Sequence, residues 1–431
     1  MSTITTTTTT STAADGTTTI STATNGTTTT TTTTTSNATT TDTPISCLGE
    51  DGLREIFLRL PDLPALARAA LTCRSWLGAV RSSPAFRRLF RDLHPPPLIG
   101  LFLELSGDTN PFFVPLRLPD SDVTPALRCG DFFLTSLPQS VSGWIITDCR
   151  DGYILLWNKL DASNLSLATL NPMTWAVDIL PLPRGIAAGS RLNFGLLGCH
   201  LQSSDENPWS FRVICVCADH HRVRAAIFSL ETSGWVIQPW VDIGGDNSLK
   251  FNAGSLVDGS IYWPYHWEGR MIRINTSTLD VTAVDLPGQL EVDGYNFKAG
   301  ETKVGQLCIV YQSGLFLHVW VRVVDSDGTE VWLLQSVVSF DAEIDRITQG
   351  MRGSIRIVKV RSGYVYLSMT CMTPAGRLHS SFFSLSLESS ELELLIEGQF
   401  GDKLVYPYIM AWPPSLVADD GSIGDDAEDS H

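Results

Sequence analysis

Early in the chain the apolar positions follow a helical period. Four apolar residues stand at the spacing i, i+3, i+4 and i+7, namely Leu53, Ile56, Phe57 and Leu60. This spacing gathers them into one stripe on a helix whose other face is polar. The helix is predicted to end at Leu60-Pro61, because proline lacks the amide proton that a continuing helix needs and disfavours helical angles in the residue before it.

Further short helices are expected directly after this one. Asp62 stands at an N-cap position with Pro64 in the following first turn, where proline is tolerated. A third helix is predicted at about residues 73–81, and Ser83-Pro84 then provides an N-cap and first residue for a fourth. The apolar faces of the second and fourth helices are Leu63, Leu66, Ala67, Ala70 and Leu71, and Phe86, Leu89 and Phe90.

From about Leu98 to Pro413 the pattern predicts strands, with no convincing amphipathic helix between them. Two elements recur every 45 to 60 residues. One is a glycine turn followed by a strand with an aromatic residue, at 151–157, 258–263, 305–311 and 363–367. The other is a strand, a polar turn and a second strand, at 167–182, 225–236, 271–287 and 382–396.

A repeat of this length with several strands per unit is typical of β-propeller blades. Counting the strands at Leu98 to Leu116 as part of the series gives about six blades. A pair of β-sandwiches is the alternative architecture. The predicted fold class is therefore α+β, with a small all-α domain of three to four helices at 44–93 followed by a mostly-β, propeller-like domain at 98–414.

The two ends of the chain have compositions that cannot bury a core. Residues 1–43 are almost entirely Thr with Ser, Ala, Gly and Asn, and residues 417–431 carry six acids and no Lys or Arg. Both tails are predicted to be disordered. The net charge of -16 and a pI near 4.8 argue against a nucleic-acid partner, although residues 44–93 hold eight arginines against five acids and would suit an acidic partner.

Composition also indicates the compartment. Nine scattered cysteines with no signal peptide before them predict reduced thiols in the cytoplasm or nucleus rather than a disulfide framework. No run of about 18 or more uncharged apolar residues exists, so no membrane span is expected.

Motifs that would carry catalysis are few. The chain lacks G-x-S-x-G, G-x-x-x-x-G-K and H-E-x-x-H sequences, and no cofactor is expected. Cys199-His200, Cys215-x-Cys217 and His220-His221 suggest zinc, but alternation along the strand places Cys215 and Cys217 together on one sheet face as core residues, so no metal site is predicted. Asp148, Arg150 and Asp151 fit either an acid-base cluster or a solvated strand-end turn.

The helical segment resembles an F-box. The resemblance rests on Leu48 with the acids Glu50 and Asp51, on the Leu60-Pro61 stop, and on Cys73-Arg74-x-Trp76. The chain departs from the family at Gly49, where proline is usual, and at Gly52, where a leucine-like residue is usual, and both glycines loosen the first turn. The strand-rich part is similar to the F-box-associated and kelch-like domains of plant F-box proteins, without the double-glycine kelch signature.

The resemblance implies partners and site residues. An F-box docks a Skp-type adaptor, and through it cullin and RING subunits, in the helix-in-groove manner. Implied adaptor-binding residues are Leu48, Leu53, Ile56, Phe57, Leu60, Pro61, Leu63, Leu66, Leu71, Cys73, Arg74 and Trp76. On the propeller, the loop with Trp263, Tyr265, His266 and Trp267 is the candidate contact for a protein substrate, because aromatic residues dominate binding hot spots.

The function expected from these features is that of a substrate-recognition subunit of an SCF-type ubiquitin ligase, with no catalytic residue of its own. Such a receptor acts by proximity, since it holds a substrate near the ligase. The alternative is a propeller that binds a carbohydrate or small ligand, which would show an aromatic shelf with a polar rim. An enzyme on the propeller face comes third and would show a deep polar pocket with converging carboxylates.

Overall fold

The computed structural model describes residues 7–11, 18–24, 27–33, 48–104, 110–116, 127–138, 143–158, 166–182, 194–203, 211–219, 222–244, 254–265, 269–288, 290, 297–373, 375–400 and 404–417. The chain divides into two compact units, residues 1–56 and 57–431, and the division falls inside the first helix. The predicted acidic tail lies outside the described residues from 418 onward.

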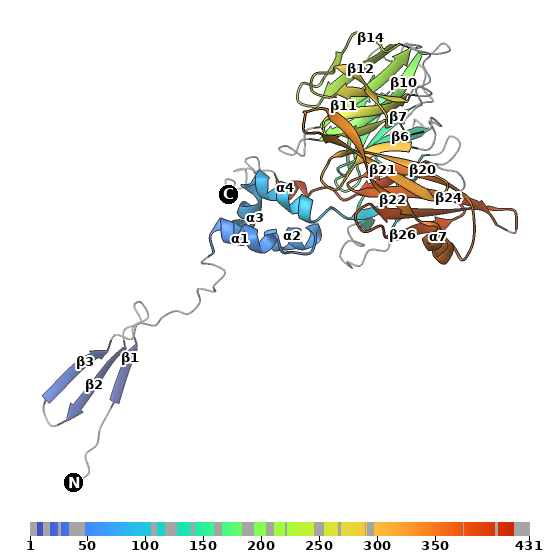
Figure 1. Ribbon diagram of the computed structural model, residues 1–431. Helices are drawn as coiled ribbons and strands as arrows, with labels where there is room; N and C mark the ends of the chain where they lie inside the picture. Colours follow the sequence, from blue (N-terminus) through green and yellow to red (C-terminus); the bar gives the residue numbers. More distant parts are fainter. Residues whose placement is uncertain are drawn as a thin grey trace. The chain divides into compact units, whose positions relative to one another are not determined.

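The first unit contains three strands and most of one helix. Strands β1 (Thr7–Ser11), β2 (Thr18–Thr24) and β3 (Thr27–Thr33) form an antiparallel sheet, seen at the blue end of the chain in Figure 1. The three strands lie within residues 1–43, the segment that the sequence predicts to be disordered. Threonine is β-branched and favours extended backbone. Helix α1 (Glu50–Phe57) ends three residues before the predicted stop at Leu60.

The next three helices begin where the capping residues predict. In α2 (Leu63–Ala70) the Asp62 carboxylate accepts the amide of Ala65, and in α4 (Pro84–Leu93) the Ser83 hydroxyl accepts the amide of Phe86. Helix α3 (Arg74–Arg81) lies between them. At its end the buried Arg87 guanidinium donates to the carbonyls of Val80 and Arg81, so α4 caps α3.

The rest of the second unit is a β-propeller. Within the described residues six antiparallel sheets follow one another along the chain. Five of them place four strands in chain order: β6 to β9 (Trp144–Arg150, Tyr153–Asn158, Ser166–Asn171, Ala176–Pro181); β10 to β13 (Phe194–Ser203, Phe211–Asp219, Arg222–Ser229, Gly234–Ile237); β15 to β18 (Ser255–Val257, Ser260–Tyr265, Arg270–Asn275, Val281–Asp285); β19 to β22 (Phe297–Glu301, Leu307–Ser313, Phe316–Val324, Glu330–Ser339); and β23 to β26 (Ser354–Arg361, Tyr364–Met372, Leu378–Ser386, Leu392–Gly398). In the second of these sheets a fifth, short strand, β14 (Val241–Asp242), also pairs with β12.

The sixth sheet joins the two ends of the propeller. Strand β27 (Leu404–Ile409) pairs antiparallel with β4 (Leu98–Glu104), which pairs with β5 (Phe112–Pro115). The first strands of neighbouring sheets also contact one another: β6 contacts β10 and β27, and β23 contacts β19 and β27. A C-terminal strand therefore closes the series that an N-terminal strand began, which leaves no open first or last blade.

The two predicted repeat elements correspond to fixed places in the blades. The glycine-turn element supplies the second strand of four sheets, which are β7, β16, β20 and β24. The strand-turn-strand element supplies the third and fourth strands, as in β8–β9 and β25–β26. The propeller prediction is thus confirmed. The two repeat elements do not include the first strand of each blade, and these first strands carry the charged residues of the candidate site.

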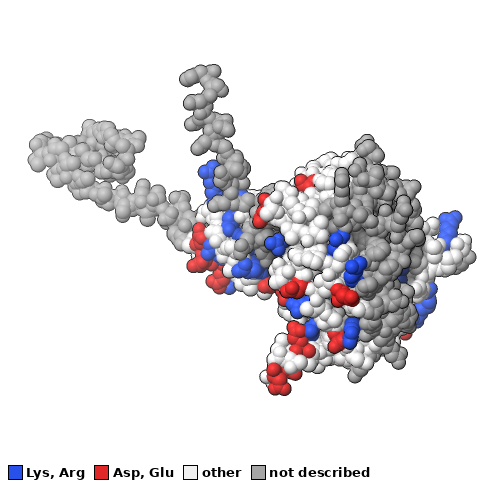
Figure 2. Space-filling view, turned by 90° about the horizontal axis from the view of Figure 1, so that it is seen from above, with Lys and Arg blue, Asp and Glu red and all other residues white. Residues whose placement is uncertain are grey.

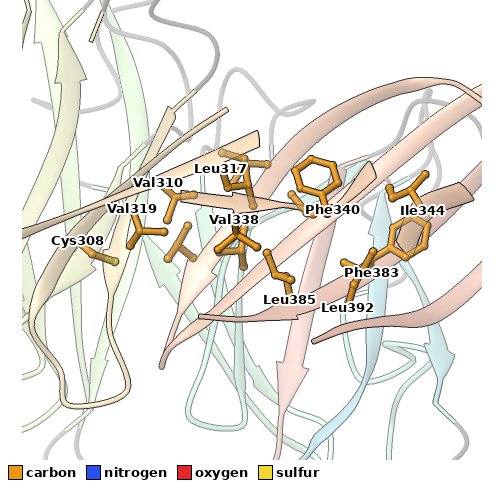
Figure 3. Close-up of a cluster of buried hydrophobic side chains, with 14 of the residues drawn as sticks. Cys308, Val310, Leu317, Val319, Val338, Phe340, Ile344, Phe383, Leu385 and Leu392 are labelled. Carbon is orange, nitrogen blue, oxygen red and sulfur yellow. The ribbon is translucent and has the colours of Figure 1, made fainter. Parts of the chain in front are cut away.

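Apolar layers between the sheets form the core. Figure 3 shows one of them, where side chains from β20 to β22 meet those from β25 and β26. The same layer holds Phe340 and Ile344 at the start of helix α7 (Asp341–Thr348). The expectation that no amphipathic helix interrupts the strands is wrong at α7. Its apolar face has too few residues to stand out from the surrounding strand pattern.

Candidate functional site

The residues expected to bind an adaptor divide into a buried and a solvent-facing group. Leu53, Phe57, Leu63 and Leu66 are at most 3% exposed. The Phe57 ring lies edge-on to Trp76 with centroids 5.5 Å apart, and 6.4 Å from the ring of Phe86. Phe57 therefore holds α3 and α4 in place, and in this conformation it offers no surface to a partner.

The solvent-facing group keeps the features of a docking surface. Leu48 is 37% exposed, Ile56 45% and Leu71 58%. Pro61, Cys73 and Arg74 are exposed as well, while Leu60 and Trp76 are half-buried. Burying one such aliphatic side chain against a partner would yield about 1.5–3 kcal/mol, so these residues are available for docking.

Of the loop expected to contact a substrate, the structure describes the side chain of Trp263, and it is not exposed. Trp263 is fully buried in the layer between two blades, where its ring lies edge-on to His200 at 5.6 Å. Alternation along β16 explains this, since Ile261 and Trp263 both point into that layer. The side chain of Tyr265 and the residues His266 and Trp267 lie outside the described part of the structure.

A cluster of charged side chains lies on the first strands of several blades. Asp148 on β6 is 1% exposed, and its carboxylate accepts the amide of Leu201 at 3.0 Å from β10. The Lys359 ammonium, on β23, lies 3.3 Å from the other carboxylate oxygen. His200 lies beside them, with Nδ1 3.8 Å from Asp148. Asp148 is thus not a solvated turn residue but links three blades.

Two arginines extend the cluster. The Arg150 guanidinium donates to the carbonyl of Leu256 on β15 at 2.9 Å. Arg361, 8% exposed, donates to the carbonyl of Cys149 and pairs with Asp151 at 3.1 Å. These contacts join β6 to β15 and β23, so the cluster ties together blades that are far apart in the sequence.

The pKa values show which charges the cluster fixes. Burial alone would raise the pKa of the Asp148 carboxyl, but Lys359, Arg150 and the backbone amide outweigh it and hold that pKa well below its usual range. Burial lowers the pKa of His200 to about 4 against the opposing pull of Asp148, so its imidazole is neutral at pH 7. A fixed carboxylate paired with cations and a neutral imidazole suit a structural link between blades.

A second surface feature was missed by the sequence analysis. Phe133 is 86% exposed at the tip of a turn whose buried Asp131 carboxylate accepts both the amide and the hydroxyl of Thr135. Trp175, 52% exposed, has φ +61° and donates from Nε1 to the carbonyl of Cys129 in the same loop. Two exposed aromatic rings thus stand on hydrogen-bonded turns, and left-handed backbone at Trp175 and at Leu134, next to Phe133, marks both turns as unusual.

The three cysteines considered as zinc ligands behave as core residues. Cys199, Cys215 and Cys217 lie in one apolar layer, which confirms the predicted shared face of the latter two. Burial raises the pKa of Cys217 to about 12. Over the described ranges no group of three or more His, Cys, Asp and Glu is placed to hold a metal ion, and His220 and His221 fall outside those ranges.

Lys and Arg are interspersed with Asp and Glu over the described residues drawn in Figure 2. Among the described residues no helix has both the length and the apolar character required to cross a membrane.

Several solved structures are similar to this chain at low sequence identity. The solved structures that resemble the chain include a quinoprotein alcohol dehydrogenase-like protein from Bacteroides thetaiotaomicron (11% identity, 73% of this chain and 78% of that chain, TM-score 0.39). A chain of the nidogen/laminin complex matches at 13% identity (72% and 99%, TM-score 0.39). A putative 6-phosphogluconolactonase from Bacteroides uniformis matches at 10% identity (72% and 99%, TM-score 0.33). These scores carry no argument about function, and no curated protein matches the chain.

A family model gives the assignment. The β-propeller of F-box protein AT5G49610-like proteins matches residues 145–416, which comprise five complete blades and the closing strand β27. This match covers more than half of the chain, and the F-box pattern stands immediately before the propeller. The chain belongs to the family of F-box protein AT5G49610-like β-propellers, and that membership supports a general role as an F-box substrate adaptor.

Proposed function

We propose that this chain is the substrate-recognition subunit of an SCF-type ubiquitin ligase. The observation that carries the proposal is the combination of an F-box pattern with a propeller of the F-box-protein family. The helical segment docks a Skp-type adaptor and, through it, cullin and RING subunits, while the propeller holds a protein substrate. The chain contributes no catalytic group and acts in the cytoplasm or nucleus.

The exposed members of the adaptor set support a docking surface. Ile56 and Leu71 are the most exposed of the aliphatic residues that the F-box pattern assigns to the adaptor, at 45% and 58%. A groove that receives such helices buries these side chains in apolar contacts. Arg74 is an exposed cation of the same helical segment, which suits an acidic adaptor.

Co-purification tests the proposal. The full chain is co-expressed with a Skp-type adaptor beside the variants Ile56→Asp and Leu71→Asp. Each variant removes about 1.5–3 kcal/mol of apolar burial and adds the cost of burying a carboxylate, so we expect at least about a hundredfold loss of affinity. Val324→Asp is the matched control, because Val324 is 66% exposed on β21 and lies outside the helical segment.

The outcomes separate cleanly. Loss of the complex in both helix variants, with the control unaffected, supports the receptor role. Absence of any complex with the wild-type chain would overturn it. A complex that survives both helix variants would place the adaptor on a different surface from the one proposed. Far-ultraviolet circular dichroism of each variant checks that the helices are still formed.

A further inference from the structure

A groove of about 790 Å³ lies between the last complete blade and the segment that leads into β4. Its walls are Pro95–Pro97, the end of β5 and part of the sheet β24 to β26. Volumes of roughly 300–1,000 Å³ are typical of ligand sites in proteins. The floor is one cross-strand row, because Tyr366 pairs with Ser384 and Ser384 pairs with Glu393 on neighbouring strands.

The groove has firm apolar walls. Tyr364 is 39% exposed in it, and the half-buried Phe400 packs against Phe112 and Phe382 with ring centroids 6.3 and 6.2 Å apart. Each of the three prolines Pro95–Pro97 has a fixed φ angle and no amide proton. These walls are therefore preorganised to pack against an extended apolar segment.

The charged residue that faces the groove is an acid. Glu393 is exposed on β26 and pairs in register with Ser384, on the face of the sheet that carries Tyr364 and Tyr366. The β-bulge between Phe382 and Phe383 turns Glu397 to the opposite face, where it lies 3.8 Å from His379 Nε2. Glu393 makes no ion pair with any residue in the described ranges, and no Lys, Arg or His is among the residues that line the groove. The groove thus presents one carboxylate beside aromatic rings.

We propose that this groove binds an extended peptide segment in which an arginine or lysine stands beside apolar residues. The cation pairs with Glu393, and the apolar neighbours pack on Tyr364, Phe400 and the proline wall. Resting on the receptor role proposed above, this segment is the part of a protein substrate that the propeller recognises.

Other occupants fit less well. A second copy of this chain carries a net charge of -16 and would be repelled, as would an anionic small molecule. The exposed pair Phe133 and Trp175 is also a protein-binding candidate, but nothing around those rings indicates which chemistry covers them. The groove combines concave shape, aromatic walls and a charge preference, and for that reason it defines a class of ligand.

Fluorescence anisotropy with the full chain tests the proposal. The probes are two pools of fluorescein-labelled nine-residue peptides with Leu, Phe and Pro around the centre, one with Arg at the centre and one with Gln. We expect the Arg pool to bind more tightly. Glu393→Gln should weaken binding of the Arg pool about threefold, as for an exposed ion pair, whereas Glu397→Gln, on the opposite face of the same strand, should leave it unchanged. Raising the ionic strength from about 0.05 to 0.5 M should weaken it further.

Glu391→Gln is the matched control, since Glu391 is exposed on the turn just before β26 and outside the groove. Failure of the Arg pool to bind, equal binding of both pools, or binding unchanged by Glu393→Gln would overturn the groove assignment. The groove assignment would also be overturned if Phe133→Ala abolished binding of the Arg pool while Glu393→Gln left it intact. Adaptor co-purification of the same preparations keeps the two proposals separate: a chain that retains the adaptor but binds neither pool leaves the receptor role standing and removes the groove.

Discussion

Asp148 should be the most sensitive polar position of the propeller. Replacing it with asparagine keeps the side-chain volume but removes the charge that Lys359 approaches at 3.3 Å. The asparagine also brings an amide N–H₂ to a site where one carboxylate oxygen accepts the Leu201 amide and the other accepts the Cys149 amide. The asparagine N–H₂ group then faces the amide of either Leu201 or Cys149, and that amide loses its acceptor.

The magnitude follows from burial. Removing one partner of a buried ion pair costs about 3–5 kcal/mol, because the other charge stays buried without compensation. Asp148 is 2% exposed at its side chain, but Lys359 is 22% exposed, so water reaches the ammonium and the lower end applies. We expect Asp148→Asn to reduce the free energy of unfolding by about 3 kcal/mol.

Urea denaturation followed by tryptophan fluorescence measures this loss. Glu388→Gln is the control, because it breaks the Lys303–Glu388 pair, which has a similar 2.9 Å separation but side chains 44% and 71% exposed. That surface pair should contribute less than about 1 kcal/mol. Adding Lys359→Met to Asp148→Asn should recover part of the stability, since no unpaired ammonium remains. Equal effects of Asp148→Asn and Glu388→Gln would refute the view that the cluster links the blades.

Three further perturbations test other parts of the structure. The folded-state pKa of His200 is lowered to about 4, below the roughly 6.5 of an unfolded histidine, so the unfolded chain binds more protons between about pH 4 and 6.5. The free energy of unfolding should therefore fall as pH drops from about 6.5 to 4. His200→Gln should reduce this pH dependence, measured as denaturation midpoints across the range. Gly152→Ala should destabilise more than Gly305→Ala, because both glycines have φ +78° but only at Gly152 would a Cβ meet the Ala411 side chain, at 2.3 Å. Arg87→Met should lower the thermal midpoint by leaving two carbonyls at the end of α3 without a donor, and an unchanged midpoint would show that water replaces the guanidinium.

Local rules in the sequence were enough to locate the secondary structure. The N-caps at Asp62 and Ser83 and the glycine turn at Gly152 act within a few residues, so their signal is contained in a short window. The blade repeat was visible for the same reason, since each hairpin carries its own turn. Helix α7 was missed because its burial depends on contacts with β21 and β25 that no short window contains.

The candidate sites were harder to predict, because each depends on residues that only the closed propeller brings together. Asp148 and Lys359 are 211 positions apart in the sequence, yet their side chains meet across the first strands of two blades. Trp263 shows the converse error: aromatic content predicted an exposed anchor, whereas strand alternation fixed its ring in the core.

The adaptor set illustrates what a motif contains and what it omits. An F-box pattern records every position that the family keeps, whether a residue packs the helices together, as Phe57 does, or remains open to a partner, as Leu71 does. Sequence spacing places both kinds on short helices but does not distinguish them, since exposure depends on the neighbouring helix. Substitutions chosen from the pattern alone would therefore mix unfolding with loss of binding. Substitutions at Ile56 and Leu71, which are already exposed in the isolated chain, change the docking surface and leave the internal contacts of Phe57 with Trp76 and Phe86 in place.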